Sequence, residues 1–179
     1  MIEEPQYRVE GPPGPIELRA YGPMILAQAT VRGGRRQAIN EGFRLIAGYI
    51  FGGHAGRTRI AMTAPVQQAP AGAEAGGLPQ GDGGDWTVSF VMPGAWTLQT
   101  LPLPTDRRVV LRPLPARRFL ANRFSGVAGG AKIERKSGEL VAYASEHGIA
   151  TVGQPMLAFY DPPWTLPFMR RNELLLEVA

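Results

Sequence analysis

The sequence contains no cysteine and only two histidines, His54 and His147. The absence of cysteine excludes disulfide bonds, thiolate nucleophiles and cysteine-based metal sites. Neither histidine has a second histidine or an acidic residue at the spacing of metal ligands. We therefore do not expect a zinc or non-haem iron site.

Long apolar runs are also missing. Prolines and polar residues interrupt the uncharged stretches, and none reaches the roughly 20 apolar residues that a membrane-spanning helix needs. The first residues, MIEEPQYRVE, contain no basic patch followed by an apolar stretch, so no signal peptide is visible. We expect a soluble cytoplasmic protein without a membrane span; a leader removed from this sequence would instead indicate the periplasm.

Motifs for catalysis and for nucleic-acid recognition are absent. The serines lie outside any GxSxG turn, and no GxxxxGK[ST] or GxGxxG loop occurs. The net charge is +4, but the arginine pairs are scattered and no recognition motif accompanies them. We predict neither enzymatic activity nor a nucleic-acid partner.

The 179 residues suit one domain, spanning 1–179, and the chain has a partial internal repeat. Residues 16–33, IELRAYGPMILAQATVRG, are echoed by residues 109–126, VVLRPLPARRFLANRFSG. Both copies indicate a strand, a turn and a second strand. Identities are few, so chance similarity is the competing explanation. The interpretation as a repeat predicts half-repeats of about 14–93 and 107–179.

An amphipathic helix is expected after each predicted strand pair. In the first helix the apolar residues recur at steps of three and four, and Gly52-Gly53 ends the pattern. The stripe consists of Ala38, Ile39, Phe43, Ile46, Ala47 and Ile50. The second helix covers the region around Leu140, and Gly148 is its expected left-handed cap.

Further strands are predicted after each helix, at 58–67, 86–93, 156–160 and 172–178. Residues 67–85 are rich in glycine, alanine and proline, which predicts a long mobile surface loop. Each half then contains two strands, a helix and two strands. Two such halves predict an α+β fold, a pseudo-twofold antiparallel β-barrel flanked by two α-helices.

Several strings resemble the SOUL haem-binding protein family in nearly full-length order. They include EEPQYRV, IELRAYGP, YIFGG, RIAMTAPV, WTVSFVMP and YDPPWTLPFMRRNELLLEV. The resemblance implies a pseudo-twofold barrel with two long helices, similar to effector-binding domains of drug-sensing transcription regulators. It also implies non-covalent binding of haem b or another tetrapyrrole, without catalysis, in an apolar groove beside the first helix.

The resemblance suggests which residues would contact the macrocycle. The groove would be lined by Phe43, Ile46, Ala47 and Ile50, with Met62 reaching it from the following strand. Core packing is the alternative role for Phe43 and Met62. Arg57 and Arg59 could meet the acid groups of the ligand, or could simply be exposed strand arginines. His54 is either a solvent-facing loop residue or a haem iron ligand.

The sequence departs from its relatives at charged positions. Asn40, Gly48 and Thr165 stand where relatives carry basic residues, and Ala20 replaces a histidine proposed as an axial ligand. A second hypothesis follows: a sensing or interaction module that binds amphipathic small molecules or a partner protein. Near the end of the chain, we expect an arginine of the RRNE string to pair with Glu173 or another buried carboxylate and to hold the last strand.

Overall fold

The structure is a computed structural model that describes residues 2–71 and 84–179. Within these ranges the chain forms nine strands, two α-helices and one short 3-10 helix. In chain order these are β1 (Tyr7–Glu10), β2 (Ile16–Tyr21), β3 (Met24–Arg32), α1 (Arg35–Ile50), β4 (Val66–Pro70), β5 (Asp85–Val91), β6 (Val109–Leu114), β7 (Arg117–Ser125), α2 (Gly130–Glu146), β8 (Thr151–Phe159), η1 (Pro167–Met169) and β9 (Arg171–Val178).

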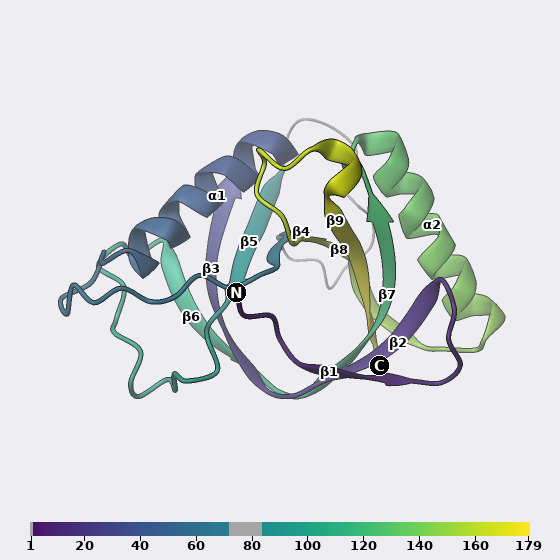
Figure 1. The fold of residues 1–179 in the computed structure, drawn as a ribbon, viewed down its shortest axis with the longest axis horizontal. Coiled ribbons are helices and arrows are strands. Elements are labelled where there is room, and N and C mark those ends of the chain that lie inside the picture. The colour runs from purple at the N-terminus through teal and green to yellow at the C-terminus, as the bar shows by residue number, and fades with distance from the viewer. Residues whose placement is uncertain (1, 72–83) are drawn as a thin grey trace.

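The strands of the described ranges form one antiparallel sheet in the order β1-β2-β7-β9-β8-β4-β5-β3-β6. Figure 1 shows this sheet curled into a half-barrel, with α1 and α2 on its outer side. The predicted α+β class and barrel-like architecture are confirmed. The curl stops short of closure, because β1 and β6 remain the two edges of the sheet.

The two halves exchange their first strands. A hairpin would join β2 to β3, but β2 instead pairs with β7 of the second half, and β3 pairs with β6. The halves also meet in the middle of the sheet, where β4 pairs with β8. The strand order has a twofold pattern. If β2, β3, β4 and β5 are matched with β6, β7, β8 and β9, the order without β1 is the same from either end of the sheet, which agrees with the predicted internal repeat. Neither half could complete its sheet alone.

The structure corrects two predicted boundaries. The strand expected over 58–67 begins only at Val66, which pairs with Phe90 on one side and Phe159 on the other. The loop expected over 67–85 is too long at both ends, because Gln67 lies in β4 and Asp85 begins β5. Its central part, residues 72–83, lies outside the described residues. The prediction placed Gln67 and Gln68 in the loop because they are polar. In the structure both are buried in β4, which pairs with β5 and β8.

Each helix covers its own half of the sheet with a separate core. The first core joins Ile46 and Ile50 of α1 to residues such as Phe90, and the second joins Leu140 of α2 to residues such as Leu174. Helix α1 approaches β5 closely at Gly42, where a Cβ atom would lie only 2.5 Å from Cγ2 of Val88. This glycine is required for packing.

We expect Gly42→Ala to lower the free energy of unfolding by about 1–3 kcal/mol, because the added methyl group overpacks the α1–β5 contact. Gly48→Ala is the matched control on the same helix, since no atom lies within 4 Å of a Cβ there. It should stabilise the protein by about 0.5–1 kcal/mol through higher helix propensity. Urea denaturation measures both changes, and equal effects would contradict this packing.

Candidate functional site

The apolar stripe of α1 lies in the core. Ile46 and Ile50 are fully buried, and Ala47 is nearly so. Phe43 is 38% exposed, and its ring centroid lies 5.4 Å from that of Phe90. The predicted groove-lining role of Ile46, Ala47 and Ile50 therefore does not fit this structure, because Ile46 and Ile50 pack in the first core and Ala47 is also buried.

His54 is buried rather than solvent-facing. Its Nε2 atom lies 2.8 Å from the carbonyl oxygen of Thr58, and its ring packs edge-on against Tyr49 at 5.7 Å between centroids. The Nδ1 atom is also buried and has no hydrogen-bond partner among the described residues. Both ring nitrogens are thus shielded from a surface ligand, which disagrees with both predicted roles of this residue.

The other predicted contact residues follow α1 in an irregular segment. Arg57 and Arg59 are exposed, as one alternative predicted, but they do not lie on a strand, and Arg57 has a positive φ of 50°. Met62 is half-buried and packs against the first core. None of the eight predicted contact residues lines either of the two cavities described next.

The first cavity is an open apolar cleft of about 970 Å³. The N-terminal segment, the β2–β3 turn, the end of β6 and the segment after β5 surround it. Its apolar lining includes Met24, Ile25, Met92, Trp96, Leu98 and Leu114. Two carboxylates lie at its rim, and both are engaged: Glu3 accepts a hydrogen bond from the Gly94 amide, and Glu4 pairs with Arg171.

The second cavity is a groove of about 460 Å³ on the concave face of the sheet. Its floor contains a row of cross-strand partners, Gln28, Ser89 and Gln67, from β3, β5 and β4. Apolar side chains flank this polar row, among them Leu26, Phe119, Met156 and Leu175. The groove adjoins the cleft, because Pro5, Met24 and Leu114 line both cavities.

Charge in the groove is unevenly compensated. Arg117 donates two hydrogen bonds to the Glu177 carboxylate, at 2.9 and 2.7 Å, so this pair is neutral overall. Arg112 lines the same groove and pairs with Leu26 in the β3–β6 ladder, but its guanidinium makes no hydrogen bond or ion pair within the part of the chain that the structure describes. The lining of the groove therefore has an excess positive charge.

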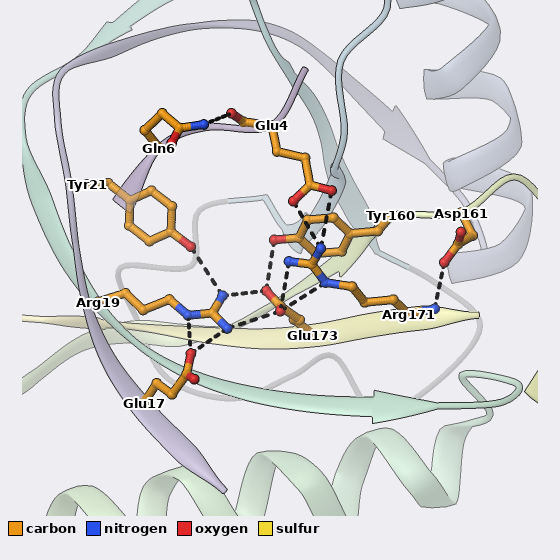
Figure 2. A network of polar contacts seen from close by, with 9 residues as sticks. All are labelled: Glu4, Gln6, Glu17, Arg19, Tyr21, Tyr160, Asp161, Arg171 and Glu173. Atoms are coloured by element: carbon orange, nitrogen blue, oxygen red, sulfur yellow. Dashed lines mark hydrogen bonds and ion pairs between the residues drawn. The ribbon is translucent and has the colours of Figure 1, made fainter. Parts of the chain in front are cut away.

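A buried ionic network occupies the concave face beside the groove (Figure 2). Its centre is Glu173, whose carboxylate accepts hydrogen bonds from Arg19 at 2.7 and 3.1 Å and from the Tyr160 hydroxyl at 2.8 Å. Arg171 donates to the same carboxylate at 3.3 Å. The predicted pairing of an arginine of the RRNE string with Glu173 is confirmed.

The network reaches the N-terminal segment through its arginines. Arg19 also pairs with Glu17 at 2.7 Å and stacks over the Tyr7 ring at 4.3 Å from its centroid. Arg171 pairs with Glu4 at 3.0 Å. These contacts hold residues 3–10 across the concave face. Sequence reasoning missed Arg19, because it lies far from Glu173 in the chain and only the exchanged strand β2 brings it close.

The network keeps Glu173 ionised. Burial alone would raise the pKa of Glu173, but hydrogen bonds from Arg19 and Tyr160 and the nearby positive charges outweigh it and lower the pKa below its usual 4.5. Burial and the charge of Glu173 raise the pKa of Tyr160, so its hydroxyl remains a donor. The acceptor positions of Glu173 are thus occupied, which indicates a structural role.

Metal and membrane features are missing from the described ranges. No group of three or more histidine, aspartate and glutamate side chains there could hold a metal ion. Neither helix in these ranges is long and apolar enough to cross a membrane.

Comparison with known proteins identifies the family. The family profile described as "SOUL heme-binding protein" matches residues 2–177. The chain belongs to the SOUL haem-binding protein family. No curated protein matches it.

Solved structures share the fold at low sequence identity. The C-terminal domain of EcmrR has a TM-score of 0.68 and 11% identity, over 97% of this chain and 98% of that one. A hydrolase from Listeria innocua has a TM-score of 0.62 and 14% identity, over 92% and 91%. SAV2435 bound to tetraphenylphosphonium has a TM-score of 0.50 and 13% identity, over 97% and 94%. These similarities concern the architecture of this SOUL protein alone.

We expect Glu173→Gln to lower the free energy of unfolding by about 3 kcal/mol at neutral pH, because Arg19 and Arg171 lose their buried counter-charge. Because folding lowers the pKa of Glu173, its ionised carboxylate contributes its full stabilisation above about pH 4.5. This stabilisation is lost as the pH falls through the pKa that Glu173 has in the folded state. Urea denaturation should show that the difference in the free energy of unfolding between variant and wild type shrinks as the pH is lowered. Exposed Glu134, changed to Gln, is the control, and a difference that did not depend on pH would disprove the charged state of Glu173.

Proposed function

We propose that this protein binds haem b or another tetrapyrrole non-covalently, without catalysis, and that the macrocycle lies in the apolar cleft. Membership of the SOUL haem-binding family supports the class of ligand. The volume and apolar lining of the cleft support the location, because small-molecule sites are commonly concave, mainly apolar and about 300–1,000 Å³ in volume.

Apolar contact can supply useful affinity for such a ligand. Burying about 300 Å² of macrocycle surface at about 25 cal/mol per Å² contributes about 7 kcal/mol before the costs of association are subtracted. A coordinate bond is therefore not required. This suits a protein whose His54 is shielded on both ring nitrogens.

The acid groups of a tetrapyrrole would find a cation in the adjoining groove. Leu114 lines both cavities, and Arg112 lies two residues before it on β6. Residues two apart on a strand face the same side and lie about 7 Å from each other. Arg112 could thus serve in place of the basic residues that this chain lacks at Asn40, Gly48 and Thr165.

Hemin titration monitored at the Soret band tests both the ligand and its location. We expect wild-type protein to give a saturable shift at micromolar concentration. Leu98→Glu should weaken binding at least about tenfold, since it places a charge against the apolar macrocycle. Phe43→Glu on α1 is the matched control, because the two side chains have similar exposure, 40% and 38%; it should leave the affinity unchanged.

The outcomes separate the function from the site. A wild-type protein without a saturable shift would contradict tetrapyrrole binding. Loss of affinity in Phe43→Glu alone would contradict the cleft and support a site beside α1. The spectrum of the hemin complex should be the same in His54→Ala, and an altered Soret band would contradict the absence of ligation by His54.

The concave groove favours a second candidate function, the binding of amphipathic small molecules. Its lining combines apolar side chains with the polar row of Gln28, Ser89 and Gln67. One structural neighbour, SAV2435, was solved with tetraphenylphosphonium, a lipophilic cation. In this chain the uncompensated Arg112 favours the opposite sign of charge, so we expect the groove to prefer anionic amphiphiles.

Thermal shift with cholate and with tetraphenylphosphonium tests this preference. We expect cholate to raise the melting temperature of the wild-type protein and tetraphenylphosphonium to have little effect. Arg112→Glu should abolish the cholate shift, because it reverses the charge of the groove. Arg107→Glu, an exposed arginine outside both cavities, is the control. Stabilisation by the cation alone would contradict the predicted selectivity.

A further inference from the structure

An exposed apolar projection connects β8 to β9. We call residues 161–170 the tongue. Four of its large apolar side chains are more than half exposed, with Trp164 at 83% and Phe168 at 73%. Leu166 and Met169 complete the set. Scattered exposed apolar residues are ordinary, but four within six positions form a patch that favours an interaction.

The tongue is held rigidly with these side chains outward. The Thr165 amide donates to the carbonyl oxygen of Pro162 at 3.0 Å, and the Met169 amide donates to that of Leu166 at 2.9 Å. The Arg170 guanidinium donates to the carbonyl oxygen of Thr165 at 2.7 Å. These bonds fix the backbone of the tongue, and in this arrangement its four large apolar side chains are exposed.

Basic groups adjoin the base of the tongue. Arg171 lies opposite Ser125 in the β7–β9 ladder, and Ser125 accepts a hydrogen bond from Nζ of Lys132 at 3.0 Å. The segment after β7 continues to Ala128, whose carbonyl oxygen accepts a hydrogen bond from Arg35 at 2.9 Å. The next residue, Arg36, is exposed.

Both helix N-termini lie at this end of the molecule. Figure 1 shows α1 and α2 beginning at the same end as η1 of the tongue. Helix N-termini carry partial positive charge, which adds to that of Arg35, Arg36 and Lys132. Within the tongue itself the only acidic residue is Asp161, whose carboxylate accepts a hydrogen bond from the Arg171 amide at 2.6 Å.

We propose that this end of the protein docks on the surface of an anionic phospholipid bilayer. Trp164, Leu166, Phe168 and Met169 would enter the interfacial region, where tryptophan is favoured, and Arg36 and Lys132 would face the headgroups. An apolar projection with basic residues near its base complements an anionic bilayer on both counts. A fluid bilayer also needs no preformed pocket to receive the tongue. This surface is distinct from both cavities.

Co-sedimentation with phosphatidylcholine vesicles, with and without phosphatidylserine, tests the proposal. We expect binding only to vesicles that contain phosphatidylserine, and loss of that binding at high salt. Trp164→Ser/Phe168→Ser should weaken binding by about tenfold or more, because membrane affinity scales with the apolar area inserted. Each of Arg36→Gln and Lys132→Gln should weaken it about fivefold.

Leu103→Ser/Val141→Ser is the matched control. Both side chains are exposed and apolar, and both lie outside the tongue. This variant should bind vesicles like the wild type.

Trp164 also provides a direct measurement of insertion by tryptophan fluorescence. Trp86 is buried and Trp96 is half-buried, so a blue shift of the emission on vesicle addition would report insertion of the tongue. No binding, equal binding to neutral vesicles, or equal losses in the two double variants would overturn the proposal. A protein that does not bind vesicles but forms a dimer in lipid-free solution would also overturn the proposal, if only the tongue variant dissociates that dimer.

Discussion

The exchange of strands between the two halves determines the rest of the structure. Because β2 pairs with β7 and β3 pairs with β6, each half completes its sheet only with a strand from the other half. The exchange also brings Arg19 of β2 to Glu173 of β9, at the centre of the buried ionic network. The sheet must therefore curl as one unit, with its convex side open to the helices and its concave side partly filled by charged groups.

The two faces of the sheet consequently have different roles. The helices cover the convex face, and the apolar stripe of α1, including Ile46 and Ile50, is used in packing. The open space lies on the concave side and at its mouth, where the groove and the cleft adjoin. In this account a ligand enters at the mouth of the half-barrel, where Met24 and Leu114 line both cavities. The cleft also reaches the edge of the first core, because Ile25 and Trp96 pack against that core.

Local patterns predicted the elements well and the site poorly, for a physical reason. The spacing of Phe43, Ile46 and Ile50 predicts a helix with one apolar face, but it does not say whether a sheet or a ligand covers that face. The pairing of Arg171 with Glu173 was predictable, since the two residues share one side of a strand. The cleft was not predictable, because Trp96 and Leu98 lie in an irregular segment without periodicity, and only the topology brings them near Met24.

The most direct test of this account is the backbone hydrogen exchange of the protein with and without saturating hemin. If the ligand lies in the cleft, hemin should slow exchange at the amides that surround it, in residues 24–25 and 94–99, while the amides of α1 remain unchanged. Slower exchange confined to α1 and residues 51–62 would contradict the account, because it would place the ligand on the helical side of the sheet.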